Sequence, residues 1–366
     1  GTVIAFAPRY PEFRYGDVVE LSGTLEFPEV LTEEDGRTFD YPSYLAAKGI
    51  SYTMFARDVV GIGEAKGNPI KSTLFDIKKH FQNALAEALP EPQSALLSGL
   101  LLGGKQSLGE DWLERFRIAG IVHIVVLSGY NMTIVAEWMV VIFRFLGFFG
   151  SLFAGAFGIV LFAIMTGGGA TVVRAAIMAI LVLVARATGR TAEMGRALLI
   201  AAALMVFVEP RILLFDPSFQ LSFLASLGLV FVAPALERRI MLWKGRRVLR
   251  EVIISTLATQ IMVLPLLLYQ TGMLSLVALP TNIIVLPLIP VAMLAGFVAG
   301  LVVLIAPSLW FLVGIIPYIL LSYILVVAEY AARIPFAAVS VTLSLCGVAL
   351  AYLAIAVMLF REAHRA

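Results

Sequence analysis

The chain has 366 residues, of which 60% are hydrophobic and 14% are charged, and its formal net charge is +2. Soluble domains contain about 45–50% apolar and about 25% charged residues, so this composition excludes an ordinary soluble enzyme and indicates an integral membrane protein. The single cysteine, Cys346, excludes an intramolecular disulfide framework and a cysteine-rich metal site.

The polar residues are concentrated at the N-terminus. Residues 1–71 contain seven Lys and Arg against eleven Asp and Glu, and no apolar run there is long enough to cross a bilayer. From about residue 120 onward, apolar segments follow one another to the end. We therefore predict a small β domain at 1–70, amphipathic interfacial helices at 71–119 and a multi-span membrane domain at 120–366. Because the chain opens on Gly1, we also expect that an upstream segment has been removed.

The first 66 residues have the pattern of strands. Residues 17–27 partly alternate in polarity, and residues 50–63 are rich in β-branched and aromatic side chains. Between them, the sequence predicts a short helix over 43–48 that stops at Gly49. A five-strand β-barrel of the oligonucleotide-binding type fits this length, and so does another small barrel.

The next segment predicts an amphipathic helix over 72–89. Its apolar residues fall at helical spacing, Ser72 suits the N-cap, and Pro90 and Pro92 end it. It is too polar to span a membrane, so we expect it at the interface. A second short helix is predicted within 93–108, ending at a Gly-Gly pair, and residues 111–122 lead into the membrane.

The remaining chain predicts a series of membrane spans. Their approximate bounds are 120–143, 150–166, 169–187, 196–208, 217–236, 252–271, 308–331 and 336–360. The stretch 274–306 carries three prolines and is expected to be broken or re-entrant. Basic residues cluster at 186–196 and at 238–250, which the positive-inside rule places in the cytoplasm. Counting spans back from 186 puts residues 1–119 on the extracytoplasmic side.

Within the first predicted span, residues 123–131 carry an unusual polar set. On a helix His123 and Asn131 share a face and Ser128 lies close to it, while Gly129 weakens the helix locally. A break near 128–130 would free backbone groups to line a cavity. The alternative is that Ser128 bonds within its own helix and Asn131 to a neighbouring helix.

Arg174 lies about two turns beyond the turn formed by Gly167, Gly168 and Gly169. A charge at this depth is costly. Its side chain either extends to the membrane surface, or points into a polar cavity and meets an anion or an acidic partner such as Glu137 or Asp216.

Polar groups recur in the later spans. Asp216 before Pro217 has the pattern of a helix N-cap. Gln220, Gln260 and Asn282 lie deeper and are followed or flanked by helix-breaking prolines or further polar residues. Together these side chains predict a polar, water-accessible path through the membrane, lined by His123, Ser128, Gly129, Asn131, Arg174, Asp216, Gln220, Gln260 and Asn282.

Catalytic, metal and cofactor sites are not predicted. The three histidines, at 80, 123 and 364, do not have the spacing of a metal ligand set. The sequence also contains no nucleotide-binding loop of the GxxxxGK[ST] form. An intramembrane serine protease built on Ser128 and His123 is an alternative, but the two residues are about 140° apart on one helix. A small-molecule or lipid transporter is the second alternative.

Five stretches closely resemble the ComEC-type competence proteins, the channels through which bacteria import transforming DNA. They are FDYPSYLAAKGI (39–50), GIVHIVVLSGYN (120–131), GGGATVVRAAIMA (167–179), DPSFQLSFLASLGLV (216–230) and LPTNIIVLPLIP (279–290). Many relatives have Leu-His where this chain has Tyr130 and Asn131. The resemblance implies an N-terminal oligonucleotide-binding fold and passage of single-stranded DNA through the inner membrane.

The resemblance also implies partners. Many members carry a metallo-β-lactamase-like nuclease domain, whose HxHxDH motif is absent from these 366 residues. Either the nuclease is a separate protein, or it lies beyond these residues, or it is missing. The expected partners are single-stranded DNA, the lipid bilayer and, by the same resemblance, a nuclease and a cytoplasmic DNA-translocating ATPase. In the N-terminal domain, the expected DNA contacts are Arg9, Arg14, Tyr41, Lys48 and Arg57. Against this, residues 1–71 have a net charge of −4, so the aromatic residues are alternatively barrel core and the charges a solvated face.

Overall fold

A computed structural model describes residues 2–8, 13–32, 37–63, 67–104, 108–125, 129–189, 193–240 and 247–364. The chain forms two compact units. The first contains Gly1–Ile77 together with Leu199–Gln220, and the second contains Lys78–Leu198 together with Leu221–Ala366. A loop between two membrane-type helices is therefore part of the N-terminal unit.

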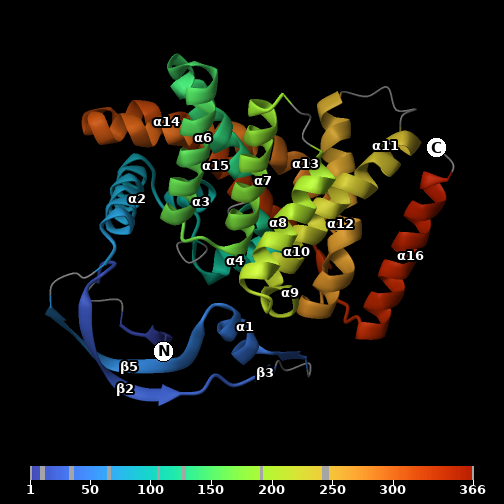
Figure 1. Ribbon diagram of the computed structural model, residues 1–366, viewed down its shortest axis with the longest axis horizontal. Coiled ribbons are helices and arrows are strands. Elements are labelled where there is room, and N and C mark those ends of the chain that lie inside the picture. Colours follow the sequence, from blue (N-terminus) through green and yellow to red (C-terminus); the bar gives the residue numbers. More distant parts are fainter. Residues whose placement is uncertain are drawn as a thin grey trace. The chain divides into compact units, whose positions relative to one another are not determined.

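The N-terminal unit is built on β5 (Ile50–Gly63), which is the central strand of a three-stranded sheet (Figure 1). The strand β1 (Thr2–Phe6) pairs with it in parallel and β2 (Val18–Glu26) in antiparallel fashion. Two further strands, β3 (Leu31–Thr32) and β4 (Thr38–Phe39), pair with each other. The expected strands at 17–27 and 50–63 are thus confirmed. The described strands do not close a barrel, because β3 and β4 pair as a separate sheet.

The helix expected at 43–48 is present as α1 (Tyr41–Ala47). It begins two residues earlier because Asp40 Oδ1 accepts a hydrogen bond from the Ser43 backbone N–H at 2.9 Å. The chain leaves it through Gly49 at φ +72°, a conformation that favours glycine. The short helix α9 (Ile212–Phe215) contacts α1 within this unit.

The helix α2 (Pro69–Ala88) begins three residues before the predicted start. Its cap is Asn68, whose Oδ1 accepts from the backbone N–H groups of Ile70 and Lys71 at 2.9 and 3.3 Å, so the prediction of Ser72 as the cap was wrong. Pro69 then occupies the first turn, where no backbone N–H is needed. Its amphipathic character is retained, because its buried side chains are Phe81, Ala84, Leu85 and Ala88.

The helix α3 (Gln93–Leu102) differs from the predicted interfacial helix. Every residue from Ser94 to Leu102 is buried, so it is a core helix without an exposed face. It packs with α2 against α14 (Ile289–Ile305), where Leu97 and Phe81 lie on Gly296 and Gly300. A Cβ on either glycine would approach these side chains within 2.4–2.7 Å. Small residues thus allow close helix packing in this core.

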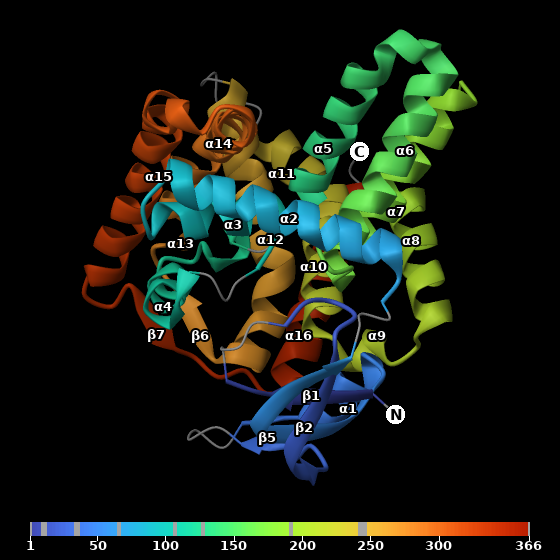
Figure 2. The same ribbon diagram turned by 90° about the vertical axis from the view of Figure 1, so that its left-hand side faces the viewer.

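The other helices belong wholly or mainly to the second unit, except α8, whose larger part from Leu199 onward belongs to the first (Figures 1 and 2). Those described are α4 (Glu110–Ile118), α5 (Gly129–Ile142), α6 (Gly147–Met165), α7 (Ala170–Ala187), α8 (Met194–Val208), α10 (Pro217–Leu227), α11 (Ala233–Ile240), α12 (Arg247–Thr271), α13 (Ala278–Val285), α15 (Trp310–Arg333) and α16 (Leu345–Ala363). The strands β6 (Met273–Ser275) and β7 (Ala338–Ser340) pair antiparallel between α12 and α16.

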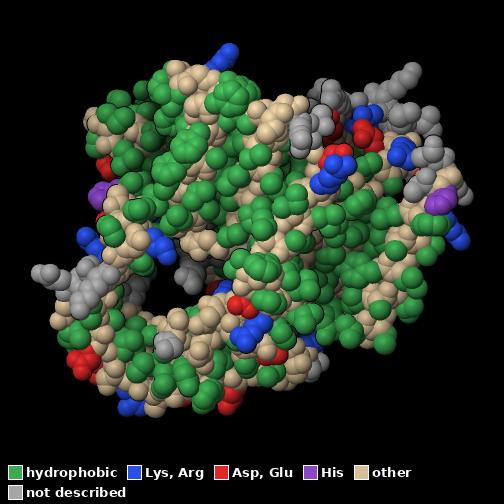
Figure 3. Space-filling view, viewed as in Figure 1, with side chains coloured by type: hydrophobic (Ala, Val, Ile, Leu, Met, Phe, Trp, Pro, Cys, Tyr) green, Lys and Arg blue, Asp and Glu red, His purple; other side chains and the backbone are tan. Residues whose placement is uncertain are grey.

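Seven segments among the described residues are long and apolar enough to cross a membrane. They are Glu137–Met165, Ala170–Ala187, Pro217–Arg238, Arg250–Thr271, Ala278–Ile305, Pro307–Arg333 and Leu345–Glu362. Hydrophobic side chains cover most of the visible face of the helices (Figure 3). The surface of a soluble protein carries more charge than this, so the chain is a multi-pass membrane protein.

Three spans differ from their predicted form. The segment 120–143 is not one helix, because Val122–Ile124 form a 3₁₀ turn and α5 begins at Gly129. The stretch 274–306 is interrupted by a 3₁₀ turn at Leu286–Leu288, as its prolines predicted. The last span begins at Leu345 rather than 336, because residues 338–340 pair as β7.

Candidate functional site

The guanidinium of Arg174 lies between two membrane helices. Arg174 is on α7, is 8% exposed, and donates from Nε to Ser222 Oγ at 2.7 Å and from Nη1 to Ser226 Oγ at 2.9 Å. Both serines are on α10. Nη1 also approaches Met178 Sδ at 3.4 Å, and the Phe223 ring lies 5.8 Å from the guanidinium carbon. The side chain therefore does not extend to the membrane surface.

The positive charge of Arg174 has no counter-ion among the described residues. Of the two acidic partners predicted for it, Glu137 pairs with Arg186 at 3.6 Å, and Asp216 accepts from the Ser218 backbone N–H at 2.9 Å. The hydroxyls satisfy donors of the guanidinium but do not neutralise it. Nη2 takes part in neither serine bond. A buried cation with a free pair of donors is matched to an anion such as a phosphate.

The helix α10 supplies the two hydroxyls through its periodicity. Ser222 and Ser226 are four residues apart and share a face, and Ser226 Oγ also donates to the Ser222 carbonyl oxygen at 3.0 Å. One π-helical turn, Gly228–Val232, follows this face. There Gly228 lies so close to α12 that a Cβ would come within 2.5 Å of the Ala258 carbonyl oxygen. Such π turns are frequent at functional sites.

The N-terminal turns of α5 and α7 pack together. Met132 on α5 is fully buried in one cluster with Val172, Ala175 and Ala176 on α7. The predicted motif at 123–131 therefore ends beside the part of α7 that carries Arg174. Among the described residues α5 begins at Gly129, and the expected interruption at 128–130 falls partly outside them. Ser128 lies outside the described residues, and the structure describes Asn131 by its backbone alone.

The segment before α5 leaves the His123 side chain accessible to solvent. Ile121, Ile124 and Val125 are buried, whereas His123 is exposed, and no hydrogen bond of its ring is found among the described residues. This segment is clamped at its start. Ser275 Oγ donates to the Ile118 carbonyl oxygen at 2.7 Å.

Asn282 completes this clamp instead of lining an open surface. It is 3% exposed, and its Nδ2 donates to the Ala278 carbonyl oxygen at 2.8 Å and lies 3.5 Å from the Gly120 carbonyl oxygen. Gly120 has φ +72°, and a Cβ there would lie 2.3 Å from the Ala278 Cβ. The backbone at Gly120 and α13 are therefore held in contact, and this fixes the path of the chain toward His123.

The other predicted amides and carboxylates have different surroundings. Asp216 is 7% exposed and caps α10, as its position before Pro217 predicted. Gln220 Nε2 donates to the carbonyl oxygens of Leu213 and Leu214 at 3.0 and 2.8 Å, which closes the corner between α9 and α10. Gln260 is half-buried on α12, five residues before Pro265 in the same helix.

The residues predicted to contact DNA in the N-terminal unit do not form one cluster of free cations. Arg14 and Arg57 are exposed, and Arg57 lies at a bulge of the β2–β5 pair. Lys48 donates to the Tyr44 hydroxyl and lies over its ring at 4.1 Å. Tyr41 stacks on Tyr44 with centroids 6.2 Å apart. Arg9 lies outside the described residues.

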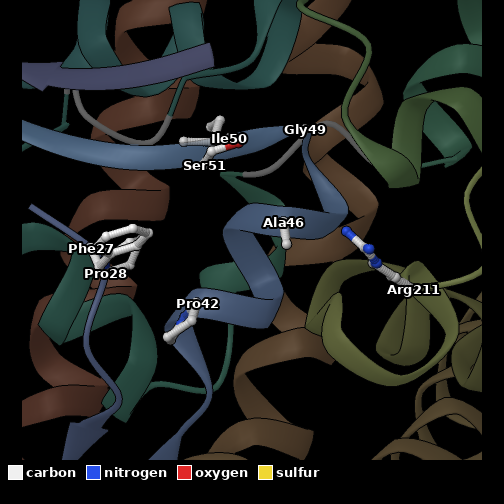
Figure 4. A pocket seen from close by; sticks show the side chains of 8 residues that line it. All are labelled: Phe27, Pro28, Pro42, Ala46, Gly49, Ile50, Ser51 and Arg211. Carbon is white, nitrogen blue, oxygen red and sulfur yellow. The ribbon is translucent and has the colours of Figure 1, made fainter. Parts of the chain in front are cut away.

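Two features escaped sequence reasoning. Ser226 was overlooked although an i, i+4 pair of hydroxyls in an apolar helix signals a polar face. Arg211 was also overlooked; it is exposed and lines an open depression of about 350 Å³ with residues of α1 and β5 (Figure 4). In sequence, Arg211 resembles an ordinary loop arginine between two spans.

The described residues do not offer a metal centre. No group of three or more His, Cys, Asp and Glu side chains among them is placed to hold a metal ion. The hydroxyls of Ser222 and Ser226 both accept hydrogen bonds from the Arg174 guanidinium. The arrangement is suited to binding an anion in passing.

Comparisons with known proteins identify the family of this chain. A family model described as Competence protein matches residues 100–365. The ComE operon protein 3 of Bacillus subtilis (strain 168) is 25% identical over 288 residues, which cover 78% of this chain and 36% of that relative. The chain therefore spans little more than a third of the curated relative that it matches. No solved structure matches the chain.

Proposed function

The chain belongs to the competence protein family, and from that membership we propose that it forms a channel that passes single-stranded DNA across the bacterial cytoplasmic membrane during natural transformation. The observation that carries the proposal is the buried guanidinium of Arg174. A strand of DNA bears one negative charge per phosphate, and a cation without a counter-ion lowers the cost of bringing that charge into the membrane.

A single weakly engaged cation suits transport better than a basic tunnel. A channel must bind its cargo strongly enough to admit it and weakly enough to release it. The two serines hold Arg174 in place when no phosphate is present, at a cost far below that of a bare buried charge. Each arriving phosphate would then replace the neutral hydroxyls as the partner of Arg174 and would not have to break an ion pair.

The pairing of loops supports an extracytoplasmic N-terminal domain. The positive-inside rule puts residues 1–119 and the loop between α8 and α10 on the extracytoplasmic side. Residues 1–77 and this loop belong to the same compact unit. The same count puts residues 273–275 and 338–340 outside, and they pair as β6 and β7. Segments assigned to one side of the membrane thus meet on that side.

Within this function, the remaining residues divide into two roles. His123, Ser128, Gly129, Asn131 and Gln260 line the path beside Arg174. Asp216, Gln220 and Asn282 brace it, because their side chains satisfy backbone groups of their own and neighbouring segments. The N-terminal domain, through Arg14, Arg57 and the aromatic residues of α1, guides the incoming strand. A separate nuclease and a cytoplasmic ATPase would supply strand degradation and force.

The proposal is tested by uptake of labelled DNA into competent cells that carry Arg174→Ala, Arg174→Lys or wild type at equal protein levels. Loss of a charge-assisted contact worth about 1.5–3 kcal/mol predicts that Arg174→Ala lowers uptake roughly tenfold or more, and that Arg174→Lys retains part of it. Exposed Arg144 provides the matched control, and Arg144→Ala should leave uptake unchanged.

Normal uptake by Arg174→Ala would remove Arg174 from the path. If uptake of DNA were normal while transport of a lipid or a small solute failed, the chain would be a transporter of that solute. A cleavage product that disappears in Ser128→Ala would instead support the intramembrane protease.

A further inference from the structure

A groove runs along α1 in the N-terminal unit and passes Arg211 on both sides. It consists of two open depressions of about 350 and 360 Å³. They share Pro42, Ala46 and Arg211, so Arg211 stands where they join. Each depression has the volume of a small-ligand site.

The charge of Arg211 is available to a ligand. Its side chain reaches toward α1 across the groove (Figure 4). Among the described residues, no carboxylate forms an ion pair with its guanidinium; its backbone N–H approaches Glu209 Oε1 at 3.3 Å. Arg211 thus brings a cation to a fold whose residues 1–71 have a net charge of −4. A free guanidinium presents paired donors to a phosphodiester.

The two depressions offer one aromatic wall each. Phe27 lines the first; its ring packs at a tilt against Tyr52 with centroids 4.8 Å apart, but it is 74% exposed, so much of the ring is open to a ligand. Phe215 lines the second and is half-buried. The rest of the apolar surface comes from Pro28, Pro42, Ala46 and Ile50, and Ser51 and Ser43 add one hydroxyl to each side. A planar ring stacks on such a wall whatever its sequence identity.

We propose that this groove binds one dinucleotide step of single-stranded DNA, with the linking phosphate on Arg211, one base against Phe27 and the next against Phe215. The inference rests on the proposed function, because it assigns a docking point to the strand that the membrane helices transport. It adds a strand contact on the loop between α8 and α10, which belongs to the N-terminal unit, to those proposed at Arg14 and Arg57.

A lipid headgroup offers the same phosphodiester chemistry. The end of α8 and α9 expose apolar side chains, of which Phe207 and Leu214 are 87% and 71% exposed, so lipid lies within reach of this loop. Two aromatic walls on either side of one cation fit two bases joined by one phosphate. A lipid phosphate would bind Arg211, but the lipid headgroup would bring no ring to stack on Phe27.

The test measures binding of a fluorescent oligothymidylate to the purified full chain in nanodiscs of zwitterionic lipid. Arg211→Gln should weaken binding on the order of tenfold and lower the slope of log K against log salt by about 0.7, the value for one lost phosphate contact on a single strand. Phe27→Ala should weaken binding without changing the slope. Arg196→Gln, at an exposed arginine of α8, is the matched control and should change neither.

Three outcomes would overturn the inference. The first is an unchanged salt slope in Arg211→Gln, and the second is an equal loss of affinity in the Arg196→Gln control. The third is that Arg211→Gln weakens binding of anionic lipid but leaves the affinity for oligothymidylate unchanged. The binding measurement needs no transport, so none of these outcomes tests the proposed function, which the uptake assay of the Arg174 variants tests separately. Conversely, failure of uptake to depend on Arg174 would not alter the measured affinity of the groove.

Discussion

The two compact units hold their arginines in opposite ways. In the helical unit, Arg174 is 8% exposed and bonded to two hydroxyls of a neighbouring helix, inside closely packed spans. In the N-terminal unit, Arg211 is exposed beside an open groove, and the sheet leaves Phe6, Phe27 and Phe55 exposed. The difference is physical. A packed unit can hold a charge only by supplying polar partners for it, whereas an open unit leaves the charge in water.

This contrast assigns different tasks to the two cations. A desolvated guanidinium interacts strongly with each phosphate but is held in position by its neighbours. A hydrated one is screened by salt and is free to capture a strand. The contrast predicts that substitutions in the helical unit affect stability, and that those in the groove affect binding alone.

The largest expected effect lies at Gly120. Gly120→Ala forces a side chain into positive φ and into contact with Ala278, so the free energy of unfolding should fall by about 3–5 kcal/mol. Gly109 has φ +80° and nothing within 4 Å of an added Cβ. Gly109→Ala is therefore the matched control for strain without overlap. Reversible unfolding in mixed micelles measures both, and equal losses would show that α13 does not clamp this segment.

The next effect separates structure from function at Arg174. Ser222→Ala with Ser226→Ala leaves the buried guanidinium without acceptors and should lower the free energy of unfolding by about 2–3 kcal/mol. Adding Arg174→Met replaces all partners by apolar groups and should recover most of that stability, because the desolvated charge is gone. Uptake of DNA should stay low in the triple variant. Recovery of uptake with stability would make Arg174 purely structural.

A smaller effect is expected at the start of α10. Asp216→Ala removes the cap that accepts from the Ser218 N–H and should cost about 1 kcal/mol, while Asp216→Asn should cost little. Thermal unfolding of the purified chain distinguishes them. An equal loss in both variants would mean that the negative charge of Asp216, and not its cap bond, matters.

The smallest expected effect is that of Arg211 on stability. Arg211→Gln at an exposed site without an ion pair should change the free energy of unfolding by no more than about 0.5 kcal/mol. Thermal unfolding beside the binding titration checks this. A large loss of stability would show that Arg211 holds α9 in place, and the groove would then have to be probed through Phe27.

Much of the local structure followed from the sequence. The strand 50–63 and the turn at Gly49 were predicted because β-branched runs and glycine stops act through their immediate neighbours. The cap at Asp216 was predicted for the same reason. The cap at Ser72 was wrong because Asn68 with Pro69 forms a better start four residues earlier. These successes and the error all concern contacts between residues close in sequence.

Contacts between distant residues were not predictable from pattern. Ser222 and Ser226 are 48 and 52 residues from Arg174, and the alternatives predicted from the sequence (the membrane surface, an anion or an acidic partner) did not include them. The full burial of α3 depends on glycines of α14 about 200 residues later. Nor does the sequence show that the described strands leave the sheet open, because short strands such as β3 and β4 pair by themselves.

The most direct measurement places a photoreactive amino acid at position Ser226 and stalls a labelled DNA strand in the channel with a bulky group at its trailing end. We predict a crosslink between strand and protein at this position, and none when the photoreactive residue stands at the outward-facing Phe207. A strand that is taken up and stalled but crosslinks equally at both positions, or at neither, would contradict a path beside Arg174.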